Sequence, residues 1–244
     1  MRSALVVGGA NGIGLAIATL LAEDERFDRI YVVDRADVAK EHKHSKFLCH
    51  KFDLCTDDYS LFDTFSDVDT LMITAGFGRL AHFKDVDEQH IVDSFAVNST
   101  AVIRIIRHFY ERISAPEDFY CGVMGSIAGF MSSPLFAVYG ATKAALKIFI
   151  ESVNVELEMI GTTNRILNIS PGSIKGTAFY NGANDLSVTR LLAADILARL
   201  WAKDDLFIPQ YDEVFKEVLA RYHDDFRKEG RHSYEYKLKS GRIK

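Results

Sequence analysis

The stretch Val7-Gly8-Gly9-Ala10-Asn11-Gly12-Ile13-Gly14 links a short apolar segment to a helical one near the start of the chain. Glycine allows the positive φ angles that such a turn needs, and it lets a bulky pyrophosphate approach the backbone closely. The N-terminus of the following helix offers N–H groups and a partial positive charge to the same pyrophosphate. A dinucleotide phosphate site is therefore predicted at Gly8, Asn11, Gly12, Ile13 and Gly14.

Asp34 lies twenty residues beyond Gly14, at the end of the second predicted strand. A dinucleotide site places an acid here to bind the ribose hydroxyls. Unit charges at about 4 Å repel by about 4 kcal/mol at an effective dielectric of about 20, and by less after screening, so Asp34 should disfavour the 2′-phosphate of NADP. Arg35 follows directly and offers a phosphate contact that offsets part of this repulsion. The residues favour NAD as the cofactor, with NADP second.

Strand-like and helix-like patterns alternate along the whole sequence. Continuous apolar runs, typical of strands covered on both faces, predict strands at 4–7, 30–33, 47–50, 70–74, 120–125 and 165–169. Helices are predicted at 12–22, 57–65, 88–113, 138–160 and 186–202, and Gly161 is expected to cap the fourth. Because parallel strands need right-handed crossover helices, the alternation predicts an α/β fold: a doubly wound parallel sheet, or Rossmann fold, in three α/β/α layers.

The length and composition fit one globular domain. The chain has 244 residues, of which 48% are apolar and 26% charged. Residues 1–210 are expected to form an NAD(P)-binding Rossmann domain that includes the catalytic site. Residues 211–244 should add an amphipathic helix at 211–228 and a basic tail to the same domain. The net charge of −5 argues against nucleic acid as a partner.

Cysteine usage and the N-terminal sequence indicate a cytoplasmic protein. Cys49, Cys55 and Cys121 show no CxxC spacing, which fits a reducing compartment. The sequence enters a strand almost at once, which leaves no room for the apolar region of a signal peptide. No uncharged apolar run approaches the roughly 18 residues of a membrane span. His42, His44 and His50 lie in a charged region without a matching set of acids or cysteines, so a solvated loop and no metal site is expected there.

Tyr139-Gly140-Ala141-Thr142-Lys143 places a phenol and an ammonium at positions i and i+4, on one face of a predicted helix. A free tyrosine has a pKa of about 10, and a nearby fixed cation should lower this pKa toward the neutral range. Ser126 ends the preceding strand, at the carboxyl edge of the sheet where doubly wound folds bind ligands. These residues form the predicted acid/base group.

With these motifs in place, the sequence resembles the short-chain dehydrogenase/reductase family, in its single-domain form, over residues 1–177 at least. The family's glycine motif corresponds to Gly8, Gly12 and Gly14. Its catalytic residues correspond to Asn98 in Val-Asn-Ser, Ser126 in Gly-Ser-Ile-Ala-Gly, Tyr139 and Lys143. The resemblance therefore implies a nicotinamide-dependent oxidoreductase.

The resemblance also implies further cofactor contacts. The acid that touches adenine in the family matches Asp53, which Leu54 follows. The Pro-Gly turn and the threonine that border the nicotinamide match Pro171, Gly172 and Thr177, and the segment between them contains Ile174. Ala75 and Gly76 match the end of the family's Asn-Ala-Gly motif, in which Thr74 replaces the asparagine here.

The resemblance assigns a role to each catalytic residue. Tyr139 would exchange a proton with the substrate oxygen, and Ser126 would hydrogen-bond to that oxygen. Lys143 would hold the nicotinamide ribose and lower the pKa of Tyr139. Asn98 would hold a water that links Lys143 to solvent. Tyr139 and Lys143 thus count among both the catalytic and the cofactor-binding residues.

Several features depart from the family or extend it. Val7 and Thr74 replace residues that brace the central sheet, so altered bracing is expected. The family's final strand and Asp-Gly-Gly end are replaced by Leu206-Phe207-Ile208-Pro209 and an extra helix, which puts the usual tetramer in doubt. A homodimer through the helices 88–113 and 138–160 is favoured by their apolar residues: Phe95, Val102, Ile105 and Phe109 on the first, and Leu146, Phe149, Ile150 and Val153 on the second. Phe179 and Tyr180 fall where the family covers its substrate, and two alternatives stand for them: they line an apolar pocket, or they pack on the core.

The leading hypothesis is an NAD-dependent oxidoreductase that interconverts a secondary alcohol and a ketone, with Tyr139 as general acid/base. The alternative is a catalytically idle, dinucleotide-sensing regulatory protein on the same scaffold, since fold alone does not choose between them. A hydrolase is disfavoured because Met124 breaks the G-x-S-x-G elbow. An epimerase or dehydratase needs a larger C-terminal substrate region than this sequence contains.

Overall fold

The computed structural model describes residues 2–56, 58–177, 185–241 and 243. Across these residues the chain forms a seven-stranded, fully parallel sheet in the order β3-β2-β1-β4-β5-β6-β7. The order reverses between β1 and β4, which opens a crevice at the carboxyl edge of the sheet. The strands are β1 (Arg2–Val7), β2 (Phe27–Asp34), β3 (Phe47–Lys51), β4 (Val68–Ile73), β5 (Tyr120–Met124), β6 (Ile166–Ile169) and β7 (Leu206–Phe207).

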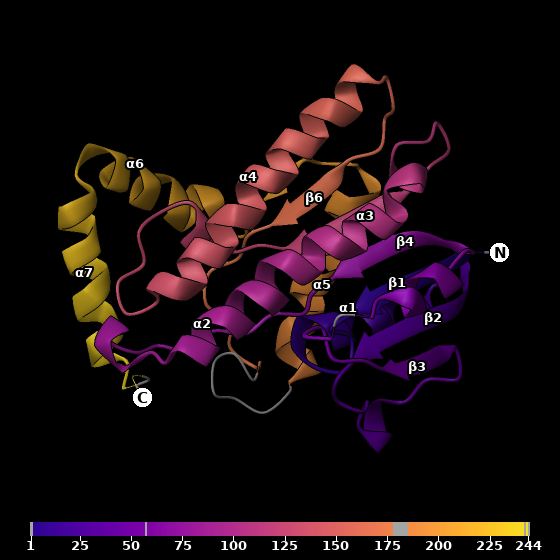
Figure 1. Cartoon of the computed structure of the whole chain (residues 1–244), viewed down its shortest axis with the longest axis horizontal. Helices are drawn as coiled ribbons and strands as arrows, with labels where there is room; N and C mark the ends of the chain where they lie inside the picture. The colour runs from indigo at the N-terminus through magenta and orange to yellow at the C-terminus, as the bar shows by residue number, and fades with distance from the viewer. Residues whose placement is uncertain (1, 57, 178–184, 242, 244) are drawn as a thin grey trace.

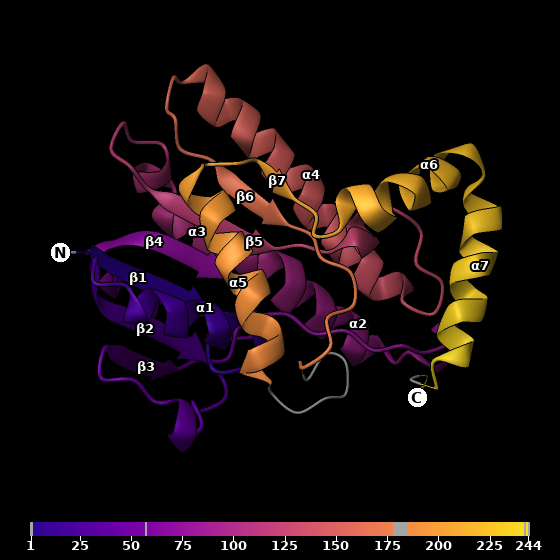
Figure 2. The same ribbon diagram turned by 180° about the vertical axis from the view of Figure 1, so that it is seen from behind.

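Helices cover both faces of the sheet (Figures 1 and 2). One face carries α1 (Gly12–Glu23) and α5 (Leu186–Trp201), and the other carries α2 (Glu88–Phe95), α3 (Ala101–Ile113) and α4 (Ala137–Met159). Successive residues of β1 point to opposite faces, so Ala4 and Val6 pack beneath α1 and α5, while Leu5 and Val7 pack beneath α3 and α4. This is the three-layer Rossmann architecture that the sequence predicts.

The glycine cap of α4 is confirmed. Gly161 has a φ of 84°, which a side chain would strain. Its N–H donates to the carbonyl of Glu158 at 3.0 Å, and the N–H of Thr162 donates to that of Leu157 at 3.3 Å. These two bonds are the Schellman pattern, which satisfies the last carbonyls of the helix.

Two predicted helices are partly wrong. Within 57–65 the described residues form only a 3₁₀ turn, Ser60–Thr64. Tyr59, Phe62 and Phe65 are buried around it at a spacing of three, which matches the three residues per turn of a 3₁₀-helix. The predicted helix 88–113 is interrupted by a π-helical turn, Ala96–Thr100, between α2 and α3.

The C-terminal segment also differs from expectation. A short final strand, β7, forms at the edge of the sheet where the sequence indicated its loss. A π turn (Tyr211–Phe215) leads into α6 (Lys216–Asp224), and the expected basic tail is a second helix, α7 (Phe226–Lys239). The predicted helix 211–228 divides at Asp225, whose carboxylate accepts the N–H groups of Arg227 and Lys228 and caps α7.

The helices α3 and α4, which were expected to pair with a second copy of the chain, expose different residues from those predicted. Most of the residues predicted on it lie in the core, because α3 and α4 turn them onto the sheet: Val102, Ile105, Phe109, Leu146, Ile150 and Val153. The outer side of α4 instead exposes Ile148, Val155 and Met159.

Within the described ranges, no helix is both long and apolar enough to cross a membrane.

Candidate active site

The turn between β1 and α1 approaches the end of β4 too closely to admit side chains. Gly8 has a φ of 83°, and a Cβ there would collide with the backbone of Ala75. A Cβ on Gly14 would collide with the Gly8 carbonyl oxygen and with Thr74 Oγ1. The first turn of α1 contains no acidic residue, so no carboxylate of its own offsets the partial positive charge at the start of the helix. This cradle fits the pyrophosphate of a dinucleotide.

Thr74 ties the end of β4 to the end of β1. Its Oγ1 donates to the carbonyl oxygens of Val7 and Gly8, at 3.0 and 3.1 Å. The N–H of Ala75 donates to the Val7 carbonyl at 3.1 Å. Val7 has no polar side chain to brace the central sheet. The hydroxyl of Thr74 therefore supplies the bracing, from the β4 side.

Asp34 lies at the carboxyl end of β2, beside the glycine turn. One carboxylate oxygen accepts the N–H of Ala10 at 3.0 Å, and the other accepts the N–H of Ala36 at the same distance. Each carboxylate oxygen has a second acceptor site, so the group can still receive hydrogen bonds from a pair of ribose hydroxyls. Arg35 is exposed next to it.

One cavity of about 840 Å³ follows the carboxyl edge of the sheet. It runs from Asp34 and Leu54, past the glycine turn, to Ser126, Tyr139 and Lys143. The predicted cofactor residues all border it: Gly8, Asn11, Gly12, Ile13, Gly14, Asp34, Arg35, Asp53, Leu54, Ala75, Gly76, Tyr139, Lys143, Pro171, Gly172, Ile174 and Thr177. Residues from six strand ends thus meet in one space.

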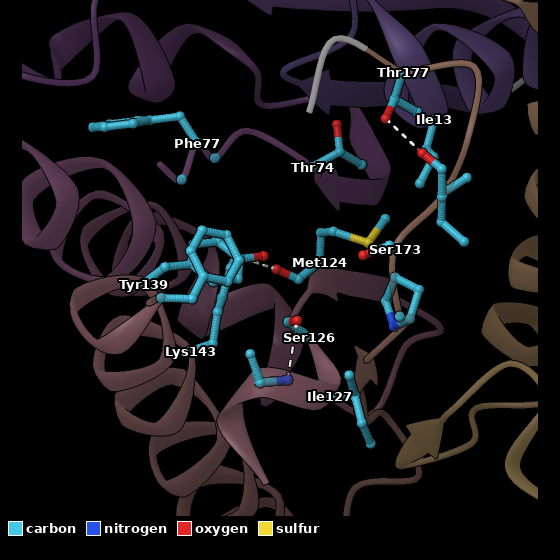
Figure 3. Close-up of a pocket in the computed structure, with 18 of the residues that line it drawn as sticks. Ile13, Thr74, Phe77, Met124, Ser126, Ile127, Tyr139, Lys143, Ser173 and Thr177 are labelled. Carbon is cyan, nitrogen blue, oxygen red and sulfur yellow. Dashed lines mark hydrogen bonds between the residues drawn. The ribbon is translucent and has the colours of Figure 1, made fainter. Parts of the chain in front are cut away.

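Ser126, Tyr139 and Lys143 lie together on one side of this cavity, opposite Ile13 and Thr177 (Figure 3). Ser126 directly follows β5, and its Oγ accepts the N–H of Ala128 at 3.2 Å. Tyr139 and Lys143 come from the first two turns of α4. All three are buried, and the Ser126 hydroxyl acts on the Tyr139 phenol to lower its pKa. A carbonyl oxygen near these two hydroxyls would meet two proton donors.

The environment shifts both titrating groups toward their neutral forms. Burial raises the pKa of Tyr139 to about 12, and hydrogen bonding with Ser126 opposes only part of that rise. Burial lowers the pKa of Lys143 to about 8. Lys143 Nζ donates to the Met124 carbonyl at 2.7 Å and lies 5.6 Å from the centre of the Tyr139 ring.

The lowering of the Tyr139 pKa that was expected from Lys143 does not appear in the cofactor-free protein. Burial is the largest effect on this pKa, and it raises the value to about 12. At neutral pH Tyr139 is a phenol that can donate its proton, while Lys143, with a pKa of about 8, is still mostly charged.

Asn98 lies behind the cavity wall and within the π turn. Its side chain pairs with the backbone of Phe77: Oδ1 accepts the N–H at 2.9 Å and Nδ2 donates to the carbonyl at 2.8 Å. Its Nδ2 also donates to Thr142 Oγ1 at 3.3 Å, one residue before Lys143. Asn98 thus connects the loop after β4 to α4. π turns of this kind often accompany functional sites.

The cavity continues past Tyr139 into a part that the sequence analysis did not assign. Its walls there come from the loop after β5 and from the C-terminal segment, with Met131, Phe136, Phe215, Val218, Arg221, Glu229, His232 and Lys237. The helical spacing in 211–228 signalled a buried face but not its packing partner. Phe179 and Tyr180, the predicted substrate cover, lie outside the described residues.

Comparison with known families gives a direct match. A family model described as short chain dehydrogenase matches residues 2–185. An uncharacterised short-chain type dehydrogenase/reductase of Sinorhizobium fredii is 30% identical over 183 residues, which cover 74% of this chain and 72% of that protein. A retinol dehydrogenase 8 of Bos taurus is 25% identical over 89% of this chain and 73% of its own.

Solved structures show the same fold. An alcohol dehydrogenase of Thermococcus sibiricus in complex with 5-hydroxy-NADP aligns with a TM-score of 0.70 at 18% identity, over 85% of this chain and 95% of that one. A short-chain dehydrogenase of Sphingobium yanoikuyae in complex with NADPH aligns with a TM-score of 0.73 at 18% identity, over 92% and 96%.

We expect Tyr139 of the cofactor-free protein to remain protonated up to about pH 10. Its pKa of about 12 lies above that of free tyrosine, so the folded state retains this proton while exposed phenols ionise. The test is an ultraviolet titration of tyrosinate in the wild type, minus the same titration of Tyr139→Phe. A difference signal that titrates near neutral pH would contradict the burial argument and restore a dominant effect of Lys143.

Proposed function

The chain belongs to the short-chain dehydrogenase family, and from this premise we propose that it is an NAD-dependent oxidoreductase interconverting a secondary alcohol and a ketone. One observation carries the proposal. Ser126, Tyr139 and Lys143 are buried together in the same cavity as the glycine turn and Asp34. A substrate carbon at the hydroxyls would therefore lie close to a dinucleotide held by that turn.

The bound nicotinamide supplies or accepts the hydride. In reduction, Tyr139 donates its phenolic proton to the carbonyl oxygen as negative charge develops there. Ser126 donates a second hydrogen bond to the same oxygen and so orients the carbonyl. In alcohol oxidation the two residues hold the hydroxyl, and Tyr139 accepts its proton. Each direction needs the phenol and the serine hydroxyl on one oxygen, and the burial of both residues in the same cavity supports this arrangement.

Lys143 and Asn98 support this chemistry in the proposal. The Lys143 ammonium would exchange its bond to the Met124 carbonyl for the hydroxyls of the nicotinamide ribose. A cation brought closer to the phenol would also stabilise the phenolate that forms during reduction. Asn98 would hold the water that returns protons to Lys143, from its place between Phe77 and Thr142.

A purely sensing role is the weaker candidate. A sensor needs the dinucleotide cradle but does not need a buried tyrosine, serine and lysine beside it. Burial of these polar groups costs stability, and catalysis gives that cost a function. The enzyme is therefore the function that the site supports best.

Tyr139→Phe should lower turnover of a good ketone substrate by about 10² to 10⁴-fold, because only the proton donor is removed. The affinity for NADH, measured by fluorescence titration, should change little. Tyr110→Phe, a half-buried tyrosine on α3 outside the cavity, is the matched control and should keep full activity. Retention of most activity by Tyr139→Phe would refute the proposed acid/base role.

We also propose that the enzyme prefers NAD over NADP because Asp34 receives the adenosine ribose hydroxyls. Its two oxygens are oriented by Ala10 and Ala36, so it cannot turn away from a 2′-phosphate without losing those bonds. NAD(H) should bind at least about tenfold more tightly than NADP(H), as expected for partly screened repulsion. Asp34→Ser should narrow or reverse this ratio by removing the charge. Equal or tighter NADP binding by the wild type would overturn the preference.

A homodimer is the proposed assembly, with the tetramer absent. Ile148, Val155 and Met159 are 59, 60 and 80% exposed along one stripe of α4, a pattern that a second copy would cover. The C-terminal segment leaves the edge strand β7 directly for α6, where the second tetramer contact would form. Light scattering should give twice the mass of the chain, and Val155→Glu should halve it. A tetramer that survives dilution would contradict this assembly.

A further inference from the structure

α6 and α7 meet at a sharp bend at Asp225, and the two helices, together termed the α6–α7 hairpin, project from the sheet beyond the start of α4 (Figures 1 and 2). Its inner side borders the unassigned end of the cavity through Phe215, Val218, Glu229 and Lys237. The hairpin is therefore a wall of the same space that contains Tyr139. Whatever reacts at Tyr139 must fit between this wall and the core.

Polar contacts hold the hairpin in one position. Within it, Glu229 is largely buried and pairs with Arg221 at 2.8 Å, which joins α7 to α6 and keeps the pKa of the Glu229 carboxyl low. Toward the core, Lys237 Nζ donates to Ser133 Oγ at 2.6 Å and to the Pro134 carbonyl at 3.0 Å. Lys237 thus fixes α7 on the loop that precedes α4.

The inner part of the wall is aromatic. Phe136 stacks on the Tyr139 ring, with centroids 4.3 Å apart and planes at 24°. Gly78 allows this stack, since a Cβ there would lie 2.7 Å from Phe136 and 2.8 Å from Tyr139. Phe215 rests against Gly172, where a Cβ would lie 2.7 Å from the ring. One ring adjoins the catalytic tyrosine and the other adjoins the turn after β6.

The character of the lining changes from the segment that leads into α6 to α7. The residues from the π turn and α6 are mostly apolar, with Val214, Phe215 and Val218 beside one charged residue, Arg221. Along α7 it becomes polar, with Glu229, His232, Ser233, Tyr236 and Lys237. A small ketone would leave most of this apolar surface wet, whereas a large ring system would cover it.

We propose that the α6–α7 hairpin is the specificity-determining wall of the site, and that the substrate is a bulky ketone or secondary alcohol with an apolar system of two or more fused rings. This inference rests on the proposed oxidoreductase function. The fused rings lie between Phe136 and Phe215, and any polar group at the far end of the substrate meets α7. Lys237 is a positioning residue that holds α7 at the distance this substrate requires.

The first test separates binding from chemistry. 2-Acetonaphthone and butanone serve as the large and small probes, and calorimetry measures their binding to Tyr139→Phe saturated with reduced cofactor. This variant keeps the pocket and lacks the proton donor. 2-Acetonaphthone should bind at least about tenfold more tightly than butanone, since each additional buried CH₂-sized group adds favourable transfer free energy. Equal binding overturns the inference, and failure of the wild type to turn over a ketone that binds overturns only the proposed function.

The second test locates the wall on α6. Phe215→Ala should weaken 2-acetonaphthone binding about tenfold and leave butanone binding within about twofold, because only the large probe reaches the ring. Phe226→Ala is the matched control, since Phe226 is exposed at the start of α7 and lies outside the cavity lining. If Phe215→Ala weakens both probes equally, or neither, Phe215 is not a specificity residue.

The third test addresses the position of α7. Lys237→Met should raise KM for 2-acetonaphthone several-fold while kcat for butanone stays unchanged, and Lys237→Arg should restore the wild-type KM because it can still donate to Ser133 and Pro134. Lys239→Met, two residues away on the exposed side of α7, is the control and should behave as the wild type. A parallel loss of kcat with both ketones, or no change in KM, would overturn the positioning role.

Discussion

The contact between the β1–α1 turn and the end of β4 is the constraint on which the site depends. Gly8 and Gly14 admit no Cβ because Ala75, Thr74 and the turn's own backbone occupy that space. Thr74 Oγ1 closes the contact with two hydrogen bonds to the end of β1. The contact lies where the strand order reverses, so it also sets the width of the crevice that contains the candidate cofactor residues together with Ser126, Tyr139 and Lys143. A bulkier turn would displace α1 and the crevice with it.

Burial then decides the chemistry of the opposite side. Tyr139 and Lys143 lie between Phe136 and the end of β5, where water cannot solvate a phenolate or an ammonium freely. The result is a protonated phenol beside a lysine whose ammonium donates to the Met124 carbonyl. The cofactor-free site is thus suited to proton donation, and the approach of further charge would adjust it toward proton acceptance.

The C-terminal hairpin closes a side of the cavity that the sheet leaves open. A doubly wound sheet presents reacting groups at its carboxyl edge but leaves them open on the side away from the cofactor. Here α6 and α7 close that side, held by the Arg221–Glu229 pair and by Lys237 on the loop after β5. Within the apolar stripe of 211–228, Phe215 packs against Gly172, and Val214 and Val218 line the cavity.

Local patterns in the sequence determined most of the scaffold and the inner site. The glycine turn, the β/α alternation, the cap at Gly161 and the spacing of Tyr139 and Lys143 each act over a few residues, so a linear reading predicts them. The tertiary structure alone decided the rest. The environment of Tyr139 raises its pKa because distant segments exclude water from it, and three aromatic residues at 59, 62 and 65 select a 3₁₀ turn because they pack together in the core. The hairpin walls the cavity because Lys237 meets Ser133 and Pro134 more than a hundred residues earlier. Such contacts depend on how whole elements pack, and that information is not contained in the periodicity of any one segment.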